Sequence, residues 1–214
     1  SGSLTIADGG TVENDSGYLG GGGGGDGTVT VSGQGGGQAS TWTNNGDLVV
    51  GQSGVGSLTI DDGGVVTSQF GAIGYDTTGD GTVVVSGRGA DGGASTWTMS
   101  STLYVGPMGA GSLRIDGGAL VESDQGIIGG EIGNPGVGDG EVVISGTDGA
   151  GNASTWNSAN LYVGAYSTGS LAIEDGGEAN TTGAGYVGYD AAGAGTVTIS
   201  SGTGDVSRWN VTNE

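Results

Sequence analysis

The chain repeats one short pattern four times, and this repetition limits the folds it can adopt more than any other feature. Gly-Ser-Leu followed by an alternating pair begins at Gly2, Gly56, Gly111 and Gly169, roughly every 55 residues. Each unit also contains a second segment of the same plan, first seen as "GTVTVSG" from Gly27. The underlying period is therefore about 27 residues.

Each period holds three short stretches in which apolar and polar residues alternate, separated by Gly, Asp, Asn and Ser. Alternation of this kind is typical of strands with one buried face, and no stretch shows helical periodicity. We therefore expect an all-β fold: a right-handed, single-stranded parallel β-helix (β-solenoid) of about eight coils of about 27 residues, with three short strands per coil. It should form a single β-solenoid segment, 1–214, with two-coil repeat units 2–55, 56–110, 111–168 and 169–214.

Three columns of side chains are predicted to fill the core. In the first strands apolar pairs recur without a polar interruption, from Leu4 and Ile6 to Val197 and Ile199. In the second strands tryptophan alternates with a small residue, which fills space without stacking indole directly on indole. A sugar-stacking role for the indoles is the alternative, and the regular alternation favours the core. The second column reads Val12, Trp42, Val66, Trp97, Val121, Trp156, Ala179 and Trp209, and the third reads Leu19, Val50, Ile73, Val105, Ile128, Val163 and Val187.

Composition narrows the choice of partners. The net charge is −20, with three Arg and no Lys or His, so the surface repels nucleic acid and anionic membranes and favours cations or basic partners. No apolar run reaches membrane-spanning length, and we expect no membrane insertion by this segment. The chain starts and ends inside the repeat pattern, so we expect it to be a piece of a longer protein.

Parallel β-helices include polysaccharide-active enzymes, so catalysis has to be weighed. Without His or Lys the base would be a carboxylate or an Arg. Glu13 and Glu122 face outward in one column but four coils apart, about 19 Å, whereas paired glycosidase carboxylates lie roughly 5–9.5 Å apart. The largest break in periodicity, "GGEIGNPGVGDG" from Gly129, adds only Glu131 and Asp139. We expect no catalytic site and no enzyme activity.

Metal, cofactor and ice-binding sites find little support. The Gly-rich run from Gly20 to Gly27 lacks the Lys of a phosphate loop, and it matches the calcium nonapeptide only in part. The outward first-strand column begins with threonines, as an ice-binding face would, but Arg114 interrupts it. We therefore expect no metal site and no cofactor.

The outward column of the third strands forms an apolar and aromatic stripe on an otherwise acidic surface. Large exposed apolar patches often mark contact surfaces, and tyrosine is favoured at interfaces. The alternative is that tyrosine and valine simply suit strands. The predicted contact stripe consists of Tyr18, Val49, Tyr104, Ile127, Tyr162 and Tyr186, with Ala72 between its halves.

The motifs "GSLTIADGG", "GTVTVSG", "STWTN" and "LYVG" together resemble the Gly-rich repeats of bacterial surface proteins: type V secretion (autotransporter) passengers and PEP-CTERM-associated proteins. The resemblance covers nearly the whole chain. It implies an extracellular parallel β-helix at a bacterial cell surface, and it implies no activity.

We therefore expect a non-catalytic structural segment of an extracellular or surface protein, such as a stalk, an adhesin shaft or a fibre-forming β-solenoid. Its partners would be further copies, associated end to end or laterally, or the adjoining repeats of a longer chain. The alternative is a glycan- or host-surface-binding adhesin passenger that uses the tyrosine stripe. A polysaccharide-active enzyme ranks third.

Overall fold

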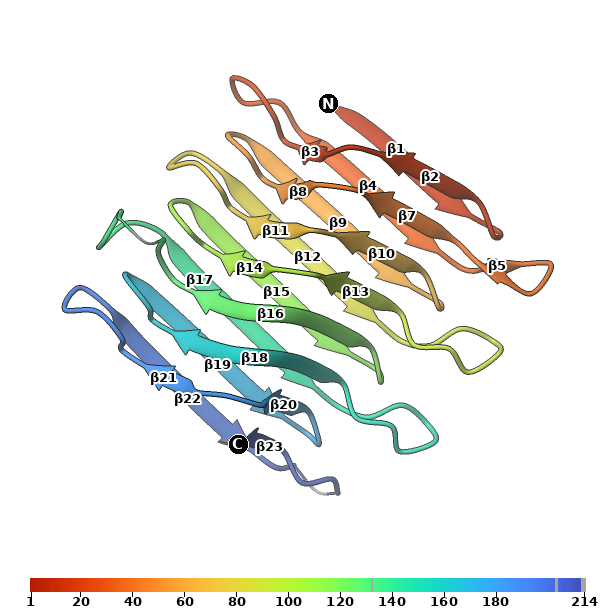
Figure 1. The fold of residues 1–214 in the computed structure, drawn as a ribbon. Coiled ribbons are helices and arrows are strands. Elements are labelled where there is room, and N and C mark those ends of the chain that lie inside the picture. The colour runs from red at the N-terminus through yellow and green to blue at the C-terminus, as the bar shows by residue number, and fades with distance from the viewer. Residues whose placement is uncertain (132, 203, 213–214) are drawn as a thin grey trace.

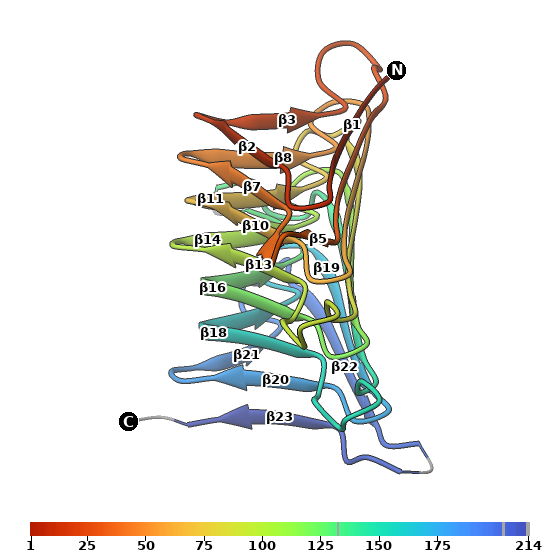
Figure 2. The same cartoon turned by 90° about the vertical axis from the view of Figure 1, so that its right-hand side faces the viewer.

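The protein contains strands and no helix in the part of the chain that the computed structural model describes, residues 1–131, 133–202 and 204–212. Two large parallel sheets face each other and extend the length of the molecule (Figures 1 and 2). The all-β class and a repeating, solenoid-like stack of parallel strands are thereby confirmed. No helix capable of crossing a membrane occurs among the described residues.

The first large sheet contains the first strand of every coil. It is eight-stranded and parallel, and the predicted inward pairs share its register, as where Leu4 lies opposite Val29 and Ile6 opposite Val31. Its strands, in spatial order, are β1 (Gly2–Ala7), β4 (Gly27–Ser32), β9 (Val55–Asp61), β12 (Asp80–Ser86), β15 (Ala110–Asp116), β17 (Asp139–Ser145), β19 (Thr168–Glu174) and β22 (Ala194–Ser200).

The second large sheet contains the second and third strands. The second strands are β2 (Thr11–Asn14), β7 (Thr41–Asn44), β10 (Val65–Ser68), β13 (Thr96–Met99), β20 (Glu178–Thr181) and β23 (Arg208–Val211). The third strands are β3 (Gly17–Leu19), β8 (Asp47–Val50), β11 (Phe70–Ile73), β14 (Thr102–Val105) and β21 (Gly185–Val187).

Two coils depart from the expected three separate strands. In β16 (Leu120–Ile128) and β18 (Thr155–Val163) the second and third strands run together as one nine-residue strand. The bend between them takes only one residue, so pairing resumes at once: Ser123 lies opposite Ser158, and Gln125 opposite Asn160.

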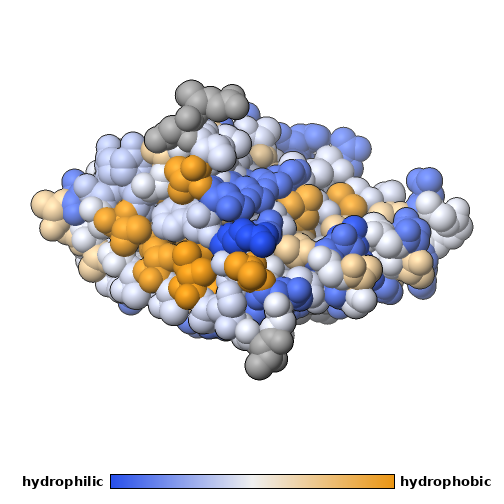
Figure 3. Space-filling model, turned by 90° about the horizontal axis from the view of Figure 1, so that it is seen from below, coloured by the Kyte–Doolittle hydropathy of each residue, from blue (hydrophilic) through white to orange (hydrophobic). Residues whose placement is uncertain are grey.

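The core lies between the two sheets and follows the predicted columns. Leu113, Ile115, Val121 and Ile128 are buried, as are their counterparts in the neighbouring coils. The columns become exposed only at the two ends of the stack, where Ile199, for example, is 48% exposed. Figure 3 views the end near β20 and β23 and shows hydrophobic residues gathered there.

The tryptophans lie inside, and the coil before each one accommodates it in two ways. Trp156 is 1% exposed, and its Nε1 donates a hydrogen bond to Ser123 Oγ at 3.1 Å. Its ring lies against Gly126, where a Cβ would come within 2.5 Å of Trp156 Cζ2. The same relations hold for the other three indoles, whose acceptors are Asn14, Ser68 and Thr181 and whose glycines are Gly17, Gly71 and Gly185.

The serine of the Ser-Thr-Trp motif joins successive coils. Ser95 Oγ accepts a hydrogen bond from the Gly63 backbone N–H at 3.0 Å, and Ser154 Oγ accepts one from Gly118 N–H at 3.0 Å. These glycines lie in the tight turn of the preceding coil, after its first strand. Asp62 occupies the left-handed region in that turn, with φ of 47°, as Asp often does in turns. The motif therefore locks each tryptophan-bearing coil onto its neighbour.

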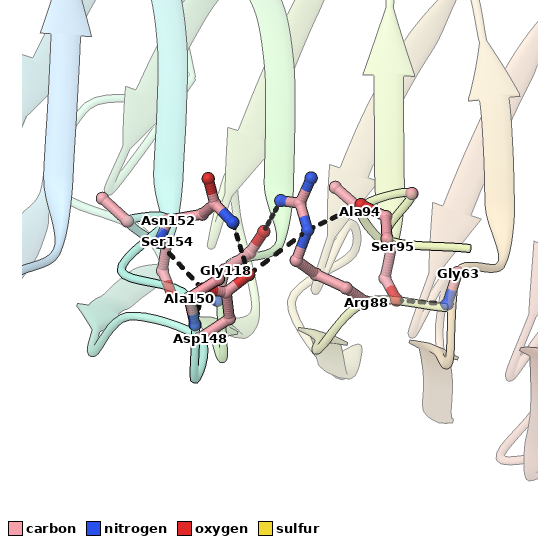
Figure 4. A network of polar contacts seen from close by, with 12 residues as sticks. Gly63, Arg88, Ala94, Ser95, Gly118, Asp148, Ala150, Asn152 and Ser154 are labelled. Atoms are coloured by element: carbon pink, nitrogen blue, oxygen red, sulfur yellow. Dashed lines mark hydrogen bonds and ion pairs between the residues drawn. The ribbon is translucent and has the colours of Figure 1, made fainter. Parts of the chain in front are cut away.

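Longer loops follow β4, β12, β17 and β22, and side chains link them along one edge of the molecule. Gln34 Nε2 donates to Asp91 Oδ1 at 2.7 Å, and Thr147 Oγ1 donates to Asp205 Oδ2 at 3.0 Å. Between these contacts Arg88 lies 3.4 Å from Asp148 and donates to the Gly118 carbonyl, as Figure 4 shows. Loops two coils apart are thus connected directly. β5 (Gln34–Gly35) and β6 (Gln38–Ala39) form a short antiparallel hairpin in the first of them.

Candidate binding face

The predicted contact stripe forms one continuous column across the third strands. Tyr18 lies opposite Val49 and Tyr104 opposite Ile127 in the parallel ladder, and Tyr162 lies opposite Tyr186. The ladder spacing of about 4.8 Å therefore brings all six predicted residues into register.

Only the aromatic members of the stripe reach the surface. Tyr18 is 54% exposed, whereas Val49 is 4% and Ile127 3% exposed. The expectation of a stripe exposed along its whole length is thus wrong for its two aliphatic members. Their side chains are shorter than the neighbouring rings, and these neighbours cover them.

The same face gathers aromatic residues that the sequence patterns did not single out. Phe70 and Tyr189 contact stripe tyrosines, Tyr75 lines a groove with Tyr18 and Val49, and Tyr166 contacts Tyr189. The face thus holds all seven tyrosines and the only phenylalanine of the chain. A sequence signal existed, because "GYD" follows two of the third strands. There Gly74 and Gly188 have positive φ and turn the chain outward just before Tyr75 and Tyr189.

Four tyrosines near β18 and β21 form a ring cluster, which we call the tyrosine cluster. Tyr162 and Tyr186 stack with centroids 4.7 Å apart and an interplanar angle of 12°. Tyr189 meets both rings edge-on with centroids 5.1 Å away, and Tyr166 lies edge-on to Tyr189 at 6.0 Å. Offset stacking and edge-to-face contacts are the favoured aromatic geometries, so the cluster is held together by its own rings.

The half of the face nearer β3 is hollowed into a groove of about 470 Å³. Val49 forms its floor, and aromatic rings and polar side chains from three neighbouring coils and the loop after β16 form its walls. We call it the acidic aromatic groove, and its walls are Tyr18, Asp47, Gln52, Phe70, Tyr75 and Glu131.

The electrostatics of the groove reflect its carboxylates. Burial raises the pKa of Tyr75, and the negative charges of Glu131, Asp76 and Asp47 raise it further. Burial also raises the pKa of Tyr104, followed by the charge of Glu131. Both effects disfavour a further negative charge, so the phenols stay neutral in a strongly negative setting.

The insertion from Gly129 lies on this face, although sequence reasoning considered it only as a weak catalytic candidate. Glu131 lines the acidic aromatic groove, and the Gly136 backbone N–H donates to the Tyr166 carbonyl at 2.6 Å. Asp139 does not belong to the insertion, since it opens β17 and pairs in register with Ala110. Residue 132 of the insertion lies outside the described residues.

The remaining sequence candidates belong to the scaffold. Glu122 accepts hydrogen bonds from Thr98 and Asn157, each at 3.4 Å, and so joins a polar ladder along the outer side of the second strands. Glu13 accepts one from Asn45 at 3.2 Å. Within the described ranges no group of three or more His, Cys, Asp or Glu side chains is placed to hold a metal ion.

No protein-family model matches the chain, and no curated protein or solved structure matches it either.

Proposed function

We propose that this chain is a non-catalytic structural segment, a right-handed β-solenoid shaft of about eight coils, in a longer extracellular or bacterial cell-surface protein. The observation that carries this proposal is the unbroken stack: one sheet pairs eight parallel strands in a single register from β1 to β22. At about 4.8 Å per coil such a stack spans nearly 40 Å. The resemblance of the repeat motifs to surface-protein repeats supports the extracellular location.

The contacts between coils favour a mechanical role. Each tryptophan, each motif serine and each glycine beneath an indole contacts the neighbouring coil, so the recurring residues of the repeat serve the stacking of coils. Polar residues are spread along the outer side in ladders instead of converging on one point. An active site is usually a local exception to its scaffold.

The experiment is an internal deletion of one two-coil unit, residues 56–110. A shaft should fold without it and become shorter by about 10 Å, measured by small-angle X-ray scattering, with an unchanged β-type circular dichroism spectrum. An unfolded deletion variant would contradict the modular stack. Antibody labelling of intact source cells tests the location, and labelling that appears only after lysis would refute the surface assignment.

A second candidate is a glycan-binding adhesin passenger. The tyrosine cluster favours it, because Tyr186 and Tyr189 present rings that are 37% and 52% exposed and could stack on sugars. Binding on a glycan array that is lost in Tyr186→Ser and Tyr189→Ser, but retained in Tyr18→Ser, would support this candidate over the shaft alone.

A further inference from the structure

The acidic aromatic groove combines ring walls with carboxylates in a way that the shaft does not require. Tyr18 comes from β3 and Phe70 from β11, two coils apart; in β8 between them, Val49 lies opposite Tyr18 and Asp47 lies opposite Phe70. The two strands are two ladder steps apart, roughly 10 Å. The groove therefore presents aromatic rings from neighbouring coils to a single bound group, and a cation held against such a ring is attracted to its face.

The charge of the groove is negative and is not compensated by the protein. Asp47 and Glu131 both line it, and no basic side chain does. The three arginines of the chain have other acidic partners: Arg88 pairs with Asp148, Arg114 with Asp116, and Arg208 with Glu178. The chain has no Lys or His that could supply a positive charge instead.

The residues that form the groove walls favour organic cations over metal ions. Calcium and magnesium need six or more oxygen ligands in a compact shell. Two carboxylates opposite three aromatic rings do not provide such a shell, and the described residues contain no cluster suited to a metal. Aromatic faces attract cations that are large, weakly hydrated and organic, and a neighbouring carboxylate adds a hydrogen-bond acceptor.

We propose that the acidic aromatic groove binds an organic cation, an alkylammonium or guanidinium group, with Tyr18, Phe70 and Tyr75 as ring walls and Asp47 and Glu131 as acceptors. The group could belong to a Lys or Arg side chain of a basic polypeptide or to a free polyamine, since both carry the same chemistry. A volume of about 470 Å³ is in the range of small-molecule sites and accommodates a whole side chain with part of its backbone.

The insertion after β16 completes the site. Glu131 reaches the groove from this loop, and the loop is anchored on its other side by the Gly136 bond to the Tyr166 carbonyl. The insertion thus adds a second carboxylate to a groove whose described residues otherwise contribute only that of Asp47.

The test is a titration of the whole chain followed by ¹H–¹⁵N NMR. The probes are N-acetyl-arginine amide, spermidine, a short oligo-arginine peptide, and N-acetyl-citrulline amide as the neutral isostere of arginine. We expect the amides of groove residues to shift with the arginine probe and not with citrulline. Tighter binding of the peptide than of spermidine would indicate a polypeptide source, and the reverse a polyamine.

Matched variants distinguish a defined binding site from the general attraction of cations to an acidic protein. Glu131→Gln should weaken arginine binding about fivefold, whereas Glu141→Gln, which removes an equal charge outside the groove, should leave it unchanged. Tyr18→Leu should weaken it about two- to fivefold, and Tyr186→Leu in the tyrosine cluster should not.

Three results would overturn the proposal. The first is the absence of any shift with all cationic probes. The second is equal loss in Glu131→Gln and Glu141→Gln, which would indicate diffuse attraction only. The third is equal binding of arginine and citrulline, which would assign the groove to neutral ligands.

Discussion

Gly126 lies beneath the indole of Trp156, and replacing it with alanine tests how the tryptophan coils are packed. A Cβ at this position would lie 2.5 Å from Trp156 Cζ2 and 2.7 Å from Leu161 Cδ1. Ordinary carbon contacts are about 3.5–4.0 Å, so both side chains, or the backbone at residue 126, must move by roughly 1 Å. Trp156 is 1% exposed and is held by its bond to Ser123, so it has little room to move.

The cost follows from three contributions. Overpacking a well-filled core costs typically about 1–3 kcal/mol. Weakening the 3.1 Å bond from Trp156 Nε1 to Ser123 Oγ adds up to about 1 kcal/mol. Replacing glycine in a strand returns about 0.5–1 kcal/mol, because glycine loses more conformational entropy on folding. The midpoints of these contributions sum to about 2 kcal/mol, which is the loss in the free energy of unfolding that we expect for Gly126→Ala.

Urea denaturation followed by circular dichroism measures this difference, and the chain offers a matched control. Gly149 lies in a loop with nothing within 4 Å of an added Cβ and with φ outside the left-handed region, so Gly149→Ala should be neutral or slightly stabilising. In a Trp156→Leu background the penalty of Gly126→Ala should shrink, because the clashing ring is gone. Equal stability of Gly126→Ala and Gly149→Ala would refute the proposed packing.

Three further predictions concern the joints and the surface. Ser95→Ala leaves the Gly63 N–H without its acceptor in a buried turn and should cost about 1–3 kcal/mol by urea denaturation; an unchanged midpoint would contradict the lock between coils. Burial raises the pKa of Tyr104 in the folded protein. The neutral phenol should therefore contribute its full stability below the unfolded pKa of about 10, and this stability should be lost as pH rises through the folded pKa. Ultraviolet difference titration measures tyrosine ionisation, and ionisation of every tyrosine like the free amino acid would contradict the prediction. Arg114→Ala should change stability by less than about 1 kcal/mol, since its 2.6 Å contact with Asp116 is partly exposed to solvent; a larger loss of stability in thermal melts at several salt concentrations would contradict a surface ion pair of ordinary strength.

The core could be predicted from the sequence because its determinants are local and periodic. Alternation placed Leu113 and Ile115 inside, and the tryptophan column placed Trp97 and Trp156 inside, all of which the structure confirms. In a parallel stack one register decides which face every side chain occupies, so a short pattern is enough once the period is known.

The binding face could be predicted only in part, because it depends on how far side chains extend from the sheet and on loops that interrupt the repeat. The column from Tyr18 to Tyr186 follows from alternation, but the burial of Val49 and Ile127 depends on how far neighbouring side chains extend. The meeting of Glu131 with Tyr75 depends on the path of an insertion that has no counterpart in the other repeats. No periodic argument can place such a loop.

Coils with tryptophan alternate with coils without it, and the contacts between them restrict how such a chain can gain or lose repeats. Trp97 takes its acceptor, Ser68, and its glycine, Gly71, from the coil before it, and that coil carries valine where the next one carries indole. Losing that one coil would set Trp42 directly against Trp97, with Leu48 in place of the glycine that makes room for the indole. Losing two coils would restore every pairing. Recombination between repeats should therefore add or remove coils in pairs and never a single coil.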